Sequence, residues 1–108
     1  MRWVIYILVV LSFTACLKED ERASDFEIRH ELKDKKWKSQ WVEGTLQNLS
    51  STPANKVKVQ MKTYQGRVLA DTRIFKIKET LFPGDVAQFC ETVGDTISRV
   101  ELMIVKVE

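Results

Sequence analysis

The stretch NKVKVQMKTY, residues 55–64, decides the fold class of this chain. Its apolar or small side chains stand at alternate positions, namely Val57, Val59, Met61 and Thr63. A period of two places one set of side chains on each face of an extended strand, so one face is apolar and the other is cationic. Half-buried strands of antiparallel sheets have this pattern. The sequence therefore predicts a strand here and an all-β domain around it.

Strand patterns also flank this stretch on both sides. Before it, Val42, Gly44 and Leu46 fall on one side of an alternating pattern, and Trp41 and Thr45 fall on the other. Pairs of residues that suit tight turns separate the segments, because glycine adopts the positive φ angles that such turns need: Gln65-Gly66, Pro83-Gly84 and Gly94-Asp95. Besides residues 55–64, we expect strands over residues 37–48, 67–80, 85–93 and 97–107.

The last of these strands has apolar residues on both faces. Val100, Leu102 and Ile104 share one face, and the alternation places Met103, Val105 and Val107 together on the other. We expect a further strand to cover that second face; the alternative is an exposed binding surface.

The segment over residues 26–36 fits two structures. Phe26, Ile28, His30 and Leu32 alternate as in a strand. Ser24 with Glu27 three residues later instead resembles the capping box that begins a helix. We favour the strand, because residues 33–36 then form a natural hairpin tip.

Length and composition fit one domain. The chain has 108 residues, of which 44% are hydrophobic and 30% charged, as in a globular chain rather than a disordered or membrane-spanning one. Six or seven short strands separated by turns are typical of a β-sandwich. We predict a small immunoglobulin-like antiparallel β-sandwich over residues 25–108.

Residues 1–15 have the shape of a secretory signal. Arg2 precedes nine consecutive apolar residues, and small residues follow them. A helix that crosses the bilayer core needs about 20 apolar residues, so this run is too short to span it. Its end, Phe13-Thr14-Ala15-Cys16, resembles the lipobox of bacterial lipoproteins. The resemblance implies acylation of Cys16 and cleavage between Ala15 and Cys16; the alternatives are an ordinary secretory signal or an uncleaved anchor.

Residues 16–24 are expected to form a lipidated tether, since they are mostly charged and show no apolar periodicity. Leu17 stands where many inner-membrane lipoproteins carry an aspartate, so the resemblance implies the outer membrane. Lys18-Glu19-Asp20 resembles the export signal of surface lipoproteins of the Bacteroidetes, a lysine followed by two acids, which favours surface display. A solvated tether would have the same composition.

A second resemblance covers residues 41–89. The run from Val42 to Asn48, followed by Pro53-Ala54 and the alternating strand, is similar to the FxLYD-type domain of bacterial envelope proteins. Tyr64-Gln65-Gly66 stands at the aromatic–glycine hairpin of that family, and Phe82-Pro83-Gly84 stands at its closing turn. The family implies an immunoglobulin-like fold and an envelope accessory or interaction module, without catalytic residues.

Residues that could carry catalysis or hold a metal are few. His30 is the only histidine, and no motif in the sequence predicts a catalytic serine or acid paired with it. Cys90 follows Phe89 in an apolar strand, so we expect a buried, inert thiol. The formal net charge of +2, with both signs interspersed, argues against a nucleic-acid partner. We expect no enzymatic activity, no cofactor and no metal site.

Lysines and tryptophans are the candidate binding residues. Lys56, Lys58 and Lys62 form a cationic stripe, which Lys76 and Lys78 would extend. Such a stripe would attract anionic headgroups, acidic polysaccharide or an acidic protein. The alternative is a solvated face, with lysines on edge strands that prevent unwanted pairing. Two aromatic residues nearby, Trp37 and Trp41, would either stack on sugar rings or belong to the core or its rim.

The leading hypothesis is a non-enzymatic lipoprotein of the bacterial cell envelope that acts as an interaction or accessory module. Its partners would be the membrane, through the lipid anchor, and another envelope protein or a polysaccharide. The alternative is a carbohydrate- or polyanion-binding module on the cell surface, formed by the two tryptophans and the lysine stripe. The sequence does not predict an oligomeric state.

Overall fold

A computed structural model describes residues 18–34 and 39–108. Within them a short 3₁₀ helix, η1 (Glu21–Asp25), precedes six strands: β1 (Phe26–Lys33), β2 (Trp41–Asn48), β3 (Val57–Gln65), β4 (Val68–Ile77), β5 (Val86–Thr92) and β6 (Arg99–Val107). The all-β prediction is confirmed, and β1 confirms the strand interpretation of residues 26–33. The expected signal, the cysteine at position 16 and Trp37 lie outside the described residues.

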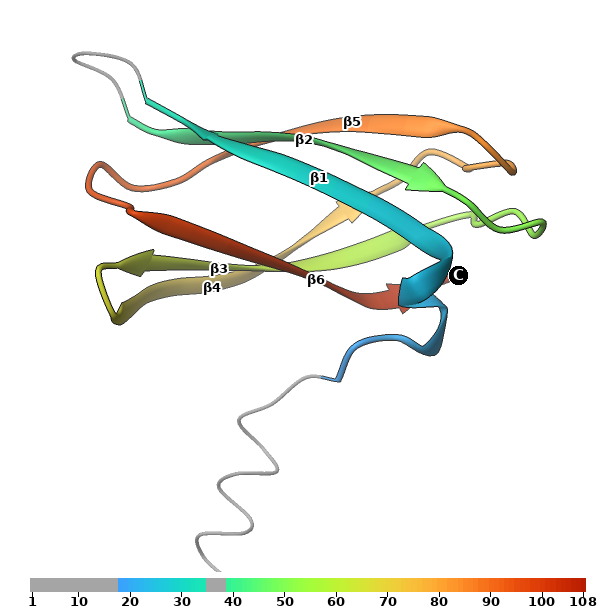
Figure 1. The fold of residues 1–108 in the computed structure, drawn as a ribbon, viewed down its shortest axis with the longest axis horizontal. Coiled ribbons are helices and arrows are strands. Elements are labelled where there is room, and N and C mark those ends of the chain that lie inside the picture. Colours follow the sequence, from blue (N-terminus) through green and yellow to red (C-terminus); the bar gives the residue numbers. More distant parts are fainter. Residues whose placement is uncertain (1–17, 35–38) are drawn as a thin grey trace, which may run out of the picture.

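The strands form two antiparallel sheets of three strands each, in the orders β1-β2-β5 and β4-β3-β6. One sheet lies over the other, so the predicted sandwich is confirmed (Figure 1). The same distribution occurs in immunoglobulin-like sandwiches, where the first, second and fifth strands share one sheet and the third pairs with an added neighbour in the other. The strand β3 is the central strand of its sheet.

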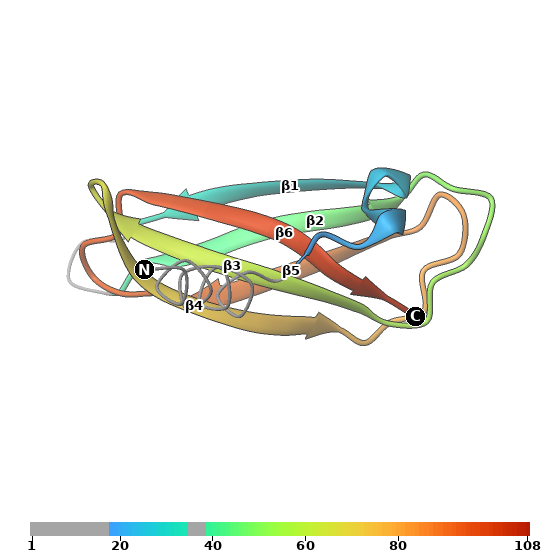
Figure 2. The ribbon, with the colours of Figure 1, turned by 90° about the horizontal axis from the view of Figure 1, so that it is seen from below.

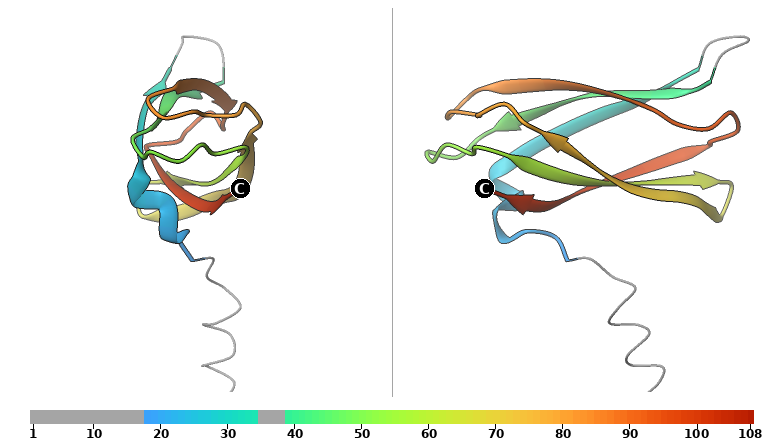
Figure 3. Two further views of the ribbon diagram at one scale, coloured as in Figure 1. Left: turned by 90° about the vertical axis from the view of Figure 1, so that its right-hand side faces the viewer. Right: turned by 180° about the vertical axis from the view of Figure 1, so that it is seen from behind.

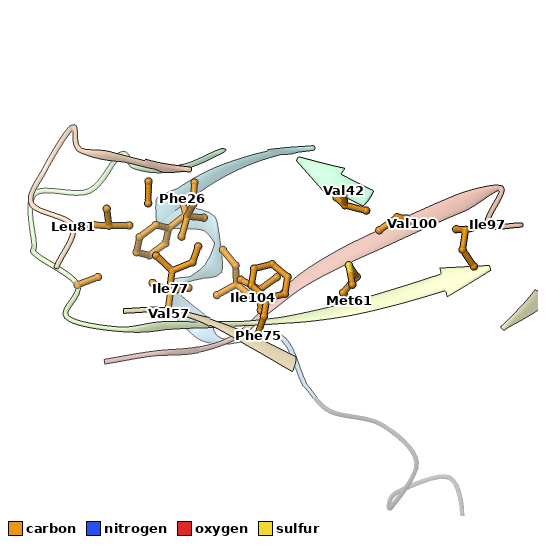
Figure 4. Close-up of a cluster of buried hydrophobic side chains, with 14 residues drawn as sticks. Phe26, Val42, Val57, Met61, Phe75, Ile77, Leu81, Ile97, Val100 and Ile104 are labelled. Atoms are coloured by element: carbon orange, nitrogen blue, oxygen red, sulfur yellow. The ribbon is translucent and has the colours of Figure 1, made fainter. Parts of the chain in front are cut away.

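The core lies between the two sheets and is built from the alternating residues of each strand. Val57, Val59 and Met61 of β3 are at most 1% exposed, and Val42 and Leu46 of β2 are fully buried. Figure 4 shows Val42 of one sheet and Val57 and Met61 of the other within this cluster. Burying one such side chain contributes roughly 1.5–3 kcal/mol, so this shared core is what holds the two sheets together.

Two glycines permit the tight turns that the sequence indicates. Gly66, in the turn between β3 and β4, has a φ of 63°, and Gly84, in the loop before β5, has a φ of 87°. Side chains other than glycine rarely adopt this left-handed conformation. Both turn predictions are confirmed.

A β-bulge in β6 changes which of its residues face the core. The pairing with β3 shifts between Lys58 and Val59, so that Val105 is the extra residue. Beyond the bulge, Val107 pairs with Val57 and packs against the core, on the same side as Ile104. The expectation that Val107 shares a face with Met103 is therefore wrong, because one inserted residue reverses the alternation.

The N-terminal residues are fixed at one end of the sandwich, which we call the tether end. The Asp20 amide donates to the Ile104 carbonyl at 2.8 Å, and the Asp20 carboxylate accepts from the Val107 amide at 3.0 Å. The same carboxylate caps η1 by accepting from the Arg22 amide at 2.7 Å. Contacts with the sheets therefore begin at Asp20, within the segment expected to be a tether.

The loops after β2 and β4 lie at the same end (Figure 3). A buried asparagine, Asn48, joins them: its amide nitrogen donates to the carbonyls of Thr52 and Leu81, each at 2.9 Å. Its side-chain oxygen accepts from the amide and the hydroxyl of Ser50. A buried amide is costly unless its hydrogen bonds are made. This network therefore holds both loops to the end of β2, where Asn48 lies.

Candidate functional site

The lysines of the predicted stripe lie on the outer face of the sheet β4-β3-β6, the face seen in Figure 2. Lys58 is directly opposite Lys76 of β4 and Lys106 of β6, so one lysine from each strand stands in a line across the sheet. We call these three residues the lysine row. Since β3 is a central strand, the interpretation of its lysines as protection for an exposed edge is wrong.

A single carboxylate contacts this row among the described residues. Glu108 forms an ion pair with Lys106 at 3.0 Å and another with Lys56 at 3.6 Å. The hydrogen bond and charge of Lys106 lower the pKa of Glu108 from its ordinary value of 4.5, and Lys56 and Lys58 lower it further. Lys58 and Lys76 have no ion-pair partner within the part of the chain that the structure describes. Positive charge is therefore in excess here.

Lys62 lies apart from the row, although it is on the same face. It pairs with Thr72 and Glu101, and the position between Lys62 and Lys58 is taken by Gln60. Gln60 is only 6% exposed, because apolar side chains on the two neighbouring strands, Ile74 and Met103, flank it. Of the predicted stripe, the structure thus brings Lys56 and Lys58 together and leaves Lys62 beyond an apolar strip.

In the far part of this face a carboxylate, Glu101, is paired with a cation. The Arg99 guanidinium lies 4.2 Å from the centre of the Tyr64 ring and pairs with Glu101 at 3.1 Å. The Tyr64 hydroxyl also donates to Glu101 at 3.2 Å. Desolvation and the hydrogen bond to Glu101 raise the pKa of Tyr64 from 10.0. These contacts pair Arg99 with Glu101, and Lys62 stands opposite Glu101 on β3. The excess of positive charge is therefore smaller here than around the lysine row.

Trp41 is not near the lysines. It lies at the start of β2 with its side chain on the outer face of the other sheet, half-buried, and its indole nitrogen donates to Glu43 at 2.7 Å. The combined surface of tryptophans and lysines is therefore not assembled by Trp41, because the two sets of residues lie on opposite outer faces of the sandwich.

The outer face of β1-β2-β5 carries an open hollow of about 590 Å³. Its lining includes Arg29, Glu31, Glu43 and the exposed Cys90. The expectation of a buried Cys90 is wrong: Ala87 and Phe89 take the inner positions of β5, so the thiol between them and Glu91 faces outward. Gly44 allows this packing, because the Phe89 ring occupies the place where a Cβ of residue 44 would be.

His30 is engaged in a structural contact. Its Nε2 atom lies 3.1 Å from the carbonyl oxygen of Val100, which joins β1 to the free edge of β6. Within residues 18–34 and 39–108, no three side chains of histidine, cysteine, aspartate or glutamate are grouped as metal ligands would be. The lysine row is therefore the described feature whose chemistry most directly indicates a ligand, and that ligand would be anionic.

Lys106 is the member of the row that sequence reasoning missed. It stands in the last expected strand at a position whose neighbours are apolar. Only the pairing of β6 with β3, and the register after the bulge, bring it beside Lys58. A local pattern contains no signal for such a pairing.

Comparisons with known proteins concern the fold. No protein-family model matches the sequence, and no curated protein sequence matches it significantly. The structure is similar to that of the trimeric lipoprotein SadB of Salmonella enterica, with a TM-score of 0.51 over 95% of this chain and 70% of that one. The two sequences are 13% identical over this match, so the likeness is one of fold. No helix among the described residues is long and apolar enough to cross a bilayer.

Proposed function

We propose that this chain is an acylated lipoprotein of the bacterial cell envelope, held at the membrane through Cys16, whose β-sandwich is a non-enzymatic interaction or accessory module. The lipobox-like sequence that ends at Cys16 supports acylation. A protein of similar fold, SadB, is a lipoprotein by name. The resemblance to the FxLYD-type domain supports the role of an interaction module.

The observation that carries the proposal is the position of Asp20. Three residues separate it from Cys16, and its hydrogen bonds to β6 fix it on the sandwich. Four residue steps span at most about 14 Å in an extended chain. An acyl group on Cys16 would therefore hold the folded domain close to the bilayer surface. Two or more acyl chains, at about 0.8 kcal/mol per buried methylene, make such an anchor stable.

The residues after Cys16 support an outer-membrane address and display on the cell surface. Leu17 replaces the aspartate of inner-membrane retention, and Lys18-Glu19-Asp20 has the composition of the surface-export signal. In this chain Asp20 also has a structural role, since its carboxylate bonds to Val107 and Arg22. Digestion of intact cells with an external protease would remove a surface-displayed protein and spare one that faces the periplasm.

The geometry around the two candidate nucleophilic or basic groups favours a non-enzymatic role. The Cys90 thiol is exposed on the outer face of β5, where Glu43 lies directly opposite it on the neighbouring strand. His30 is occupied by the Val100 carbonyl and lies on another strand from the thiol. Among the described residues no hydrogen bond joins the two groups, although both line the hollow on this face, and nucleophilic catalysis requires such a pair.

Metabolic labelling with an alkyne analogue of palmitate tests the anchor. The wild-type chain and the variant Cys90→Ala should both incorporate the label, whereas Cys16→Ala should not. Because Cys90 is the only other cysteine, its replacement is a matched control. Unchanged labelling of Cys16→Ala, or a mature protein that still begins at Met1, would contradict the proposal.

A further inference from the structure

We propose that the lysine row, together with Lys56, docks the domain onto an anionic lipid surface beside its own anchor. This inference rests on the acylation of Cys16 proposed above. The occupant is a layer of negatively charged lipid headgroups, and the docked face is the tether-end half of the outer surface of β4-β3-β6.

The tether leaves the fold beside this surface. Asp20 forms hydrogen bonds with the backbone of Ile104 and Val107, and Lys106 lies between these two residues on the edge strand β6. Figure 1 shows the described N-terminal residues passing this end of β6 on the side away from β1-β2-β5. Neighbouring strands lie about 4.8 Å apart, so the whole row is within roughly 15 Å of that edge. A short anchor at Cys16 therefore brings these lysines to the bilayer.

The charge of the surface matches that of the proposed partner. Four lysines meet there around one carboxylate, Glu108. Each basic residue close to a membrane of anionic lipids contributes about 1 kcal/mol of attraction.

Stability does not account for the row. Like charges placed directly opposite one another on adjacent strands destabilise a sheet. Protection of an edge against pairing explains lysines on β4 and β6, but it does not explain Lys58 on the central strand. An external anion that neutralises all three lysines at once gives the arrangement a function.

Per-residue lysine labelling on vesicles tests the proposal. The acylated full-length protein is reconstituted into vesicles of phosphatidylcholine alone, or of phosphatidylcholine with phosphatidylglycerol, and is treated with an amine-reactive reagent. We expect Lys58, Lys76 and Lys106 to react about fivefold more slowly on the anionic vesicles, which is the factor that 1 kcal/mol per lysine gives. Lys33, on the other sheet, should react equally on both. The difference should vanish in 1 M salt, where the screening length falls to about 3 Å.

Matched charge variants separate the row from net charge. In Lys58→Gln/Lys76→Gln/Lys106→Gln, the remaining Lys56 should lose its protection on anionic vesicles. The control Arg29→Gln/Lys33→Gln/Arg67→Gln removes the same number of positive charges elsewhere, and Lys56 should stay protected in it.

Each other outcome overturns one part of the argument. Equal labelling on both kinds of vesicle, with the protein floating with them, overturns docking and leaves acylation intact. Protection that arises only on addition of an acidic polysaccharide, such as polygalacturonate, overturns the lipid in favour of that partner. A protein that does not float with either vesicle overturns the anchor, and the docking with it.

Discussion

The two outer faces of the sandwich differ in how their charged side chains are paired, although both sheets cover the same core. On β1-β2-β5, Arg29 pairs with Glu27 and Lys33 pairs with Glu31, so cation and anion alternate along a strand. On the tether-end half of β4-β3-β6, three lysines face one another across the sheet. Exposed ion pairs contribute about 0–1 kcal/mol each, so neither face decides whether the chain folds. The outer faces are therefore free to serve binding, and the unbalanced one is where we propose that an anionic partner binds.

The largest expected effect is a loss of stability on truncating the core, and it should be similar in the two sheets although their outer faces differ in charge. Leu46→Ala in β2 and Met61→Ala in β3 should each lower the free energy of unfolding by about 2–5 kcal/mol, because both side chains are buried in the shared core. Urea denaturation followed by circular dichroism measures both. If one variant lost stability and the other did not, the two sheets would not share a single core.

A smaller change in stability, of opposite sign on the two outer faces, is expected when charged side chains are replaced. Lys58→Gln/Lys76→Gln should leave stability unchanged or raise it by up to about 1 kcal/mol, because it removes like charges placed opposite one another and keeps the Lys106–Glu108 ion pair. Arg29→Gln/Lys33→Gln should lower stability by up to about 1 kcal/mol, because it breaks two exposed ion pairs. Denaturation in low salt and in 1 M salt checks this. A marked loss of stability in Lys58→Gln/Lys76→Gln would contradict it.

The smallest effect concerns Glu108. Its pKa lies below 4.5 in the folded protein, chiefly because of Lys106, so it contributes stability above pH 4.5 that is lost as the pH falls through the lowered value. Titration of its carboxyl carbon by NMR should show the depressed pKa. Lys106→Gln should return it toward 4.5, and Lys33→Gln should leave it unchanged. An equal pKa in all three proteins would show that the row exerts no field on Glu108.

Most of the strands were predictable because alternation is a local property. The pattern in residues 55–64 assigned the faces of β3 correctly, and the same reasoning placed Val42 and Leu46 inward in β2. The site was predicted only in part. Lys56 and Lys58 belong to it, but Lys62 is separated from it by Gln60, and Lys106 enters from a distant strand. Acylation at Cys16, after cleavage at Ala15, stays a prediction.

By itself, the sequence determined the β-strands, the inward face of most of them and the two glycine turns, because these depend on neighbouring residues and on backbone sterics. Only the tertiary structure decided that β3 is central, that the bulge at Val105 returns Val107 to the core, and that the Cys90 thiol faces outward. It also assembled the lysine row. The physical reason is that strand order and register depend on contacts between segments far apart in the chain, which leave no mark in the local pattern.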